Sequence, residues 1–124
     1  MAAHVISGIE MAQEVRAEVS KGVQDLIESG GPTPGLAAVL VGDDPASAIY
    51  VRNKRRACNE TGIFSETFAM PATTSEADVI SLVDELNRDQ LFHGILVQLP
   101  LPEHIDEQNV ILAIDPDKDV DGLH

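Results

Sequence analysis

The chain has 124 residues and a formal net charge of -13, because 21 Asp and Glu residues outnumber 8 Lys and Arg residues. This length is typical of one domain, and a hydrophobic content of 44% is enough to form a core, so intrinsic disorder is excluded. The acidic excess argues against nucleic-acid binding and against binding to anionic membranes, since both need a surplus of Lys and Arg.

A single cysteine, Cys58, excludes an intrachain disulfide and a zinc site built from several cysteines, and it fits a reducing compartment. The four histidines lie far apart, without the HxxxH or HxH spacing of metal ligands, so we expect no bound metal. The start of the chain has no basic stretch followed by a long apolar run, and no cleavage signature. We therefore expect a cytoplasmic protein.

The first predicted element is a helix over residues 8–29, where apolar side chains recur at steps of three and four and form one stripe. Ser7 can cap its start, and Gly30 begins a Gly-Gly-Pro sequence that ends it. Residues 36–41 are all apolar, which predicts a strand buried on both faces.

A second helix is expected over residues 45–61, because it would begin with a proline and be followed by Gly62, a typical stop. Residues 63–70 contain β-branched and aromatic side chains, which predicts a second strand. Thr73 and Glu76 have the spacing of a capping box and predict the start of a third helix.

The third predicted strand, residues 94–99, is an apolar run interrupted by one polar residue, Gln98, and stopped by Pro100. We expect a short helix of about ten residues to follow from Asp106. Residues 115–122 are expected to form a loop.

This alternation of helices and strands is typical of an α/β fold, so we expect a three-layer sandwich in which helices flank a mainly parallel sheet. Ligands of such sheets bind beyond the carboxyl ends of the strands. This rule selects two segments, residues 42–47 after the first strand and residues 98–102 after the third.

Four polar side chains are candidates for a site at this edge. Tyr50 and Lys54 are four residues apart and share one helix face. Such a pair can also be purely structural, with the lysine side chain lying along a half-buried ring. Gln98 ends a buried strand, where its carboxamide needs a partner, and a lysine ammonium would satisfy its carbonyl oxygen. Asp121 is either a turn residue or an acceptor for a ligand.

Arg52 and Arg56 lie on roughly the opposite side of the same helix from Tyr50. They either form a solvated face that compensates the acidic charge of the protein or attract the anionic tail of a ligand. The sequence has no glycine-rich dinucleotide fingerprint, no phosphate-binding loop and no nucleophile elbow.

Four ordered segments, residues 41–47, 50–54, 94–102 and 115–122, together resemble the bifunctional methylenetetrahydrofolate dehydrogenase/methenyltetrahydrofolate cyclohydrolase family. The resemblance implies that residues 1–124 are a folate-binding catalytic domain. In the family, a Rossmann domain that holds NADP or NAD follows this domain, and it is absent from this chain. The resemblance further implies a homodimer, tetrahydrofolate derivatives as partners, and little activity for these residues alone.

Site residues follow from the resemblance, position by position. Lys54 matches the catalytic lysine, Tyr50 the aromatic side chain that lies against the folate, and Gln98 the amide that is paired with the lysine. Asp121 matches the carboxylate that holds the pterin, and its two oxygens suit two neighbouring N–H donors.

Three further residues complete the expected site. Leu99 and Pro100 are implied to contact the substrate, and Ser47 is either a supporting partner of Lys54 or a helix cap. A free lysine is charged at neutral pH, so a role as a base requires burial, which we expect against Tyr50 and a ligand ring.

The implied reactions are NADP-dependent oxidation of 5,10-methylenetetrahydrofolate to 5,10-methenyltetrahydrofolate, and hydrolysis of the latter to 10-formyltetrahydrofolate. One alternative is a non-catalytic folate-binding or oligomerisation domain on the same scaffold. A phospho-receiver domain is a further alternative, since Asp43 and Asp44 follow the first strand. That alternative lacks an aspartate at the end of the third strand, where Gln98 stands.

Overall fold

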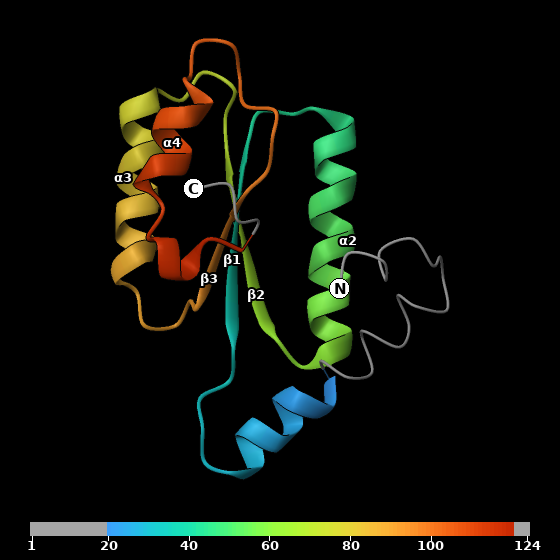
Figure 1. Ribbon diagram of the computed structural model, residues 1–124. Coiled ribbons are helices and arrows are strands. Elements are labelled where there is room, and N and C mark those ends of the chain that lie inside the picture. Colours follow the sequence, from blue (N-terminus) through green and yellow to red (C-terminus); the bar gives the residue numbers. More distant parts are fainter. Residues whose placement is uncertain (1–19, 121–124) are drawn as a thin grey trace, which may run out of the picture.

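A computed structural model describes residues 20–120 and shows a parallel sheet between two helical layers (Figure 1). One helix covers one face of the sheet, and two helices cover the other. The predicted three-layer α/β sandwich is therefore confirmed. Residues 20–28 of the first predicted helix are helical, whereas Ser7 and residues 8–19 lie outside the described residues.

The sheet contains three strands in the spatial order β2-β1-β3, and both neighbouring pairs are parallel. The strands are β1 (Gly35–Val41), β2 (Phe64–Met70) and β3 (Gly94–Val97). The central strand β1 pairs with β2 along its whole length and with β3 through its middle residues. The carboxyl ends of all three strands consequently meet at one edge of the sheet.

The third strand ends at Val97, two residues earlier than predicted. The backbone N–H of Gln98 still donates to the carbonyl oxygen of Val39 at 2.9 Å. Pro100 has no N–H with which to extend the ladder, so the chain leaves the sheet here. As a result, Gln98 lies at the boundary between the strand and the following loop.

The helices are α2 (Pro45–Thr61), α3 (Glu76–Arg88), α4 (Glu107–Ala113) and the 3-10 helix η2 (Pro116–Lys118). The second predicted helix has the expected bounds, and Gly62 ends it with a φ of 85°, a conformation that favours glycine. α4 begins directly after Asp106, as expected, whereas η2 is a short helical turn within a segment that we expected to be a loop.

The predicted capping box at the start of α3 is wrong. Ser75 is the N-cap, and its hydroxyl accepts a hydrogen bond from the backbone N–H of Asp78 at 3.1 Å. Glu76 does not reach back to its own helix start. Its carboxylate accepts from the backbone N–H of Asp106 at 2.6 Å and from the side-chain amide of Asn109 at 3.2 Å. Tertiary contact with α4 has therefore displaced the local capping pattern.

This assignment predicts a difference between two neighbouring hydroxyl residues. Ser75→Ala should lower the free energy of unfolding by about 1 kcal/mol, because an N–H of the first turn loses its acceptor. Thr73→Ala should change it by less than about 0.5 kcal/mol. Urea unfolding followed by circular dichroism measures both. A larger loss of unfolding free energy for Thr73→Ala than for Ser75→Ala would contradict this assignment and favour the capping box.

Two apolar cores lie on the two faces of the sheet. The larger packs β1 and β3 against α3 and α4, and Val39, Val83 and Ile95 are fully buried in it. The smaller packs the sheet against α2 through Ala38, Val51 and Leu96. In the same layer, burial raises the pKa of the Cys58 thiol above its ordinary value, which keeps the thiol protonated at neutral pH.

Candidate functional site

The loops that follow the three strands meet at the carboxyl edge of the sheet. Gly42, after β1, has a φ of 95°. A β-carbon built on it would lie 3.7 Å from the Cβ of Ala72, after β2, and 3.9 Å from the Cγ of Pro102, after β3. The two segments selected from the sequence thus lie together at the edge where parallel sheets bind ligands.

Lys54 and Gln98 are in contact at this edge. The Nζ of Lys54, on α2, donates to the Oε1 of Gln98 at 3.4 Å. Gln98 is only 9% exposed, and its amide nitrogen donates to the carbonyl oxygen of Leu99 at 3.0 Å. Because that bond uses the nitrogen side of the carboxamide, the oxygen is turned toward Lys54. A lysine is therefore the neighbour of the buried carboxamide.

Ser47 is buried beneath this pair, with 2% of its surface exposed. Its hydroxyl oxygen lies 2.8 Å from the Oδ2 of Asp44, to which it donates, and 3.4 Å from the carbonyl oxygen of Leu99. It is not a helix cap, because Asp44 holds the N-cap position of α2. Ser47 instead contacts the carbonyl group that orients the amide of Gln98, which in turn accepts from Lys54.

Tyr50 and Lys54 are both exposed in the chain without a ligand. Tyr50 is 56% exposed, and Lys54 is also exposed. The residues that α2 buries against the sheet include Val51 and Cys58, so Tyr50 and Lys54 lie at the margin of this face. The ring of Tyr50 alone does not bury Lys54, and burial between this ring and a ligand ring stays a prediction. Further burial of the amine would require a ligand or another segment.

The remaining predicted site residues lie along the same edge or beyond the described part. Leu99 is half-buried and Pro100 is exposed, and the peptide bond between them is cis. Asp121 lies outside the described residues, which end at Val120. Asp119 forms a parallel bridge with Ile95 on β3. The last described residues therefore run alongside the strand that leads to Gln98.

Sequence reasoning missed the residues that hold the loop after β3 in place. Glu107 accepts a hydrogen bond from the backbone N–H of Leu101 at 2.8 Å. The ring nitrogen Nε2 of His104 lies 2.7 Å from the carbonyl oxygen of Thr74, in the loop after β2. The contact of His104 joins residues 30 positions apart, so no local spacing could have indicated it. The spacing of Asp44 and Ser47, by contrast, is a local signal that could have been used.

The arginine side chains of α2 are exposed, as both interpretations of them require. Within residues 20–120, no three His, Cys, Asp or Glu side chains are grouped as metal ligands. No helix in this part of the chain has the length and apolar character needed to cross a bilayer.

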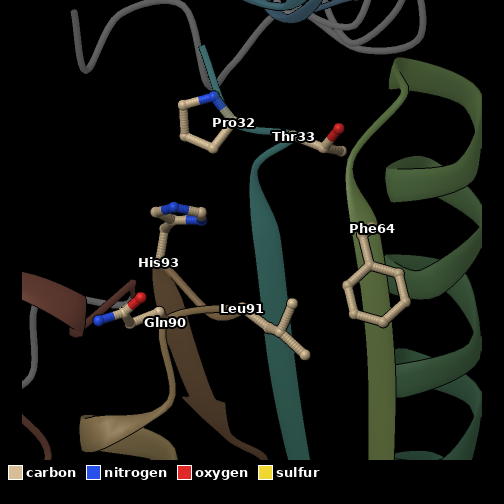
Figure 2. Close-up of a pocket in the computed structure, with 6 residues that line it drawn as sticks. All are labelled: Pro32, Thr33, Phe64, Gln90, Leu91 and His93. Atoms are coloured by element: carbon tan, nitrogen blue, oxygen red, sulfur yellow. The ribbon is translucent and has the colours of Figure 1, made fainter.

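A hollow lies at the opposite, amino end of the sheet (Figure 2). Its lining is mostly apolar and includes the exposed side chains of Phe64 and Leu91. The Nδ1 of His93, which also lines it, accepts a hydrogen bond from the backbone N–H of Gly35 at 3.1 Å and thereby closes the start of the ladder. The polar residues Thr33 and Gln90 also line this hollow.

The parallel sheet and its two helical layers define an α/β domain of the class whose members bind ligands at the carboxyl edge of the sheet. Residues 6–121 match the family described as tetrahydrofolate dehydrogenase/cyclohydrolase, catalytic domain, and the chain belongs to this family. This match argues against the phospho-receiver alternative.

Individual relatives agree with the family match. The chain is 58% identical over 123 residues to the bifunctional protein FolD of Moorella thermoacetica, covering 99% of this chain and 44% of the relative. The structure of a 5,10-methylenetetrahydrofolate dehydrogenase from the silkworm Bombyx mori is similar with a TM-score of 0.92 and 39% identity, over 94% of this chain and 40% of that one.

A third similar protein is the methylenetetrahydrofolate dehydrogenase-cyclohydrolase (FolD) of Trypanosoma brucei, whose structure is a complex with NADP and an inhibitor. The TM-score is 0.88 and the identity 34%, over 92% of this chain and 39% of that one. This chain thus spans less than half the length of these relatives.

Proposed function

We propose that this domain binds a tetrahydrofolate derivative at the carboxyl edge of its sheet and takes part in one-carbon folate interconversion. The reactions are the NADP-dependent oxidation of 5,10-methylenetetrahydrofolate and the hydrolysis of 5,10-methenyltetrahydrofolate to 10-formyltetrahydrofolate. The observation that supports this proposal most directly is the contact of 3.4 Å between Lys54 and Gln98 at that edge, within the family match.

In the hydrolysis, water attacks the methenyl carbon that bridges N5 and N10, and a base takes the proton of the water. The bond between this carbon and N5 then breaks, N5 takes up a proton, and the carbon stays on N10 as a formyl group. Lys54 is the proposed base, and it must act as a neutral amine. A folate ring lying over Tyr50 would exclude water from the amine and so favour its neutral form. Gln98 orients the amine without adding a negative charge, which would favour the protonated form.

The binding part of the proposal involves the aromatic ring and the acidic loop. The exposed ring of Tyr50 offers an apolar face to a planar ligand. Asp121 is proposed to hold the pterin, whose two neighbouring N–H donors match the two oxygens of a carboxylate. The segment before Asp121 runs parallel to β3, whose carboxyl end leads to Gln98, which agrees with this role.

The proposal assigns no nucleotide site to this domain. Among residues 20–120, the loops at the carboxyl edge contain no glycine-rich turn followed by a helix of the kind that cradles a pyrophosphate. The part of this domain in the oxidation is therefore to hold the methylene carbon in position. NADP, where bound, supplies the acceptor for the hydride.

Ligand titration of the 124-residue chain tests the proposal. With 5-formyltetrahydrofolate, a stable folate derivative, we expect weak binding and NMR shifts confined to the backbone amides of Gln98, Leu101 and the first half of α2. We expect no binding of NADP. Folate shifts confined to the hollow at the amino end of the sheet would contradict the proposed site, and tight binding of NADP would contradict the division of roles.

A further inference from the structure

The segment between α4 and the last described residue is held by the end of a different helix. The Nζ of Lys118 donates to two carbonyl oxygens at the carboxyl end of α3, those of Leu86 and Asp89, each at 3.1 Å. A lysine ammonium is the group expected there, because the final carbonyls of a helix lack partners within the helix and carry a partial negative charge.

A second side chain of α3 holds the same segment. The amide nitrogen of Asn87 donates to the carbonyl oxygen of Ala113 at 2.8 Å, and its Oδ1 accepts from the backbone N–H of Asp115 at 2.9 Å. Both ends of the carboxamide are therefore used. Asn87 and Lys118 thus form four hydrogen bonds between the end of α3 and residues 113–118, and we call these four bonds the clamp.

The other side of the segment lies against β3. The backbone N–H of Val120 lies 3.5 Å from the carbonyl oxygen of Ile95, next to the parallel bridge between Ile95 and Asp119. Gly94 makes this approach possible, since a β-carbon there would lie 2.6 Å from the Cγ2 of Val120. The segment thus has one register on the strand, and it is anchored on α3 just before it reaches the strand.

We propose that Lys118 is a positioning residue that fixes the register of residues 115–120 on β3 and thereby sets the affinity of the domain for folate. The inference rests on the proposed function, in which Asp121 holds the pterin one residue after Val120. Lys118 is half-buried between α3 and this segment, so it acts through the backbone and not through contact with the ligand.

The test uses Lys118→Met, which keeps most of the side-chain volume but removes the charged donor. In this variant, the backbone amides of Asp119 and Val120 should exchange with solvent about tenfold faster, and the affinity for 5-formyltetrahydrofolate should fall about tenfold. Both effects follow because the two charge-assisted hydrogen bonds of Lys118 are lost. Lys118→Arg keeps a charged donor and should restore most of both. Lys21→Met, an exposed lysine in the helix of residues 20–28, is the matched control.

The two readouts separate this inference from the proposed function. Protected amides of Val39 and Val97 show that the sheet of the variant is folded. Unchanged exchange at Val120 overturns the clamp, and faster exchange with unchanged folate affinity overturns its link to binding. If the unmodified chain does not bind 5-formyltetrahydrofolate at all, the proposed function fails and the role in affinity fails with it, while the exchange rates still decide whether Lys118 fixes the register.

Discussion

Replacing Lys54 with glutamine is expected to slow the hydrolysis of 5,10-methenyltetrahydrofolate by a factor of about 100 to 10,000, the usual contribution of a general base. Glutamine keeps a polar side chain that can still contact Gln98, but it cannot take a proton from water. Binding of 5-formyltetrahydrofolate should change much less than turnover, because the ring of Tyr50 and the carboxamide of Gln98 are retained.

Turnover is best measured in a chimera in which residues 1–124 replace the corresponding part of the Moorella thermoacetica relative, which is 58% identical over 123 residues. Lys21→Gln, far from the carboxyl edge, is the matched control and should leave turnover unchanged. Unchanged hydrolysis in Lys54→Gln would rule out this lysine as the base. Equal losses of turnover and binding would favour the alternative of a domain that only binds folate.

Replacing Ile95 with alanine is expected to lower the free energy of unfolding by about 2 to 5 kcal/mol, because the lost methyl groups leave a cavity in the larger core. Ile95 is 0% exposed and lies in the middle of the strand that leads to Gln98. A loss of this size is a large fraction of the total stability of a typical domain, which is about 5 to 15 kcal/mol.

Urea unfolding measures this loss, which should appear as a lower midpoint with an unchanged slope of the unfolding free energy against urea concentration. Ile27→Ala is the matched control, since Ile27 is 45% exposed on the helix of residues 20–28 and should change stability by less than about 0.5 kcal/mol. Similar losses for the two substitutions would contradict the assignment of the core to the sheet and to α3 with α4.

The elements of the fold could be predicted well from local patterns. The bounds of α2 were correct because Pro45 and Gly62 act on the backbone through their own conformational limits, which need no tertiary partner. The start of α3 was wrong because Glu76 bonds to Asp106, 30 residues away, and this contact competes with the capping box. The end of β3 was placed too late because the apolar run continues beyond the last ladder residue.

The candidate site was predictable in part. A carboxamide at the end of a buried strand indicated that Gln98 has a specific partner, and the helical spacing of Tyr50 and Lys54 placed both on one face of α2. The exposure of Tyr50 and Lys54 could not be predicted, because it depends on how α2 rotates its buried face, with Val51 and Cys58, onto the sheet.

The sequence by itself determined the order of helices and strands, the parallel sheet and the edge at which the candidate site residues lie, because periodicity, proline and glycine act over a few residues. Only the tertiary structure decided the hydrogen bonds that hold this edge. His104 meets Thr74 across 30 residues, and Asp106 meets Glu76 across 30. Such contacts arise from packing of whole elements against one another, and no local pattern of side chains encodes them.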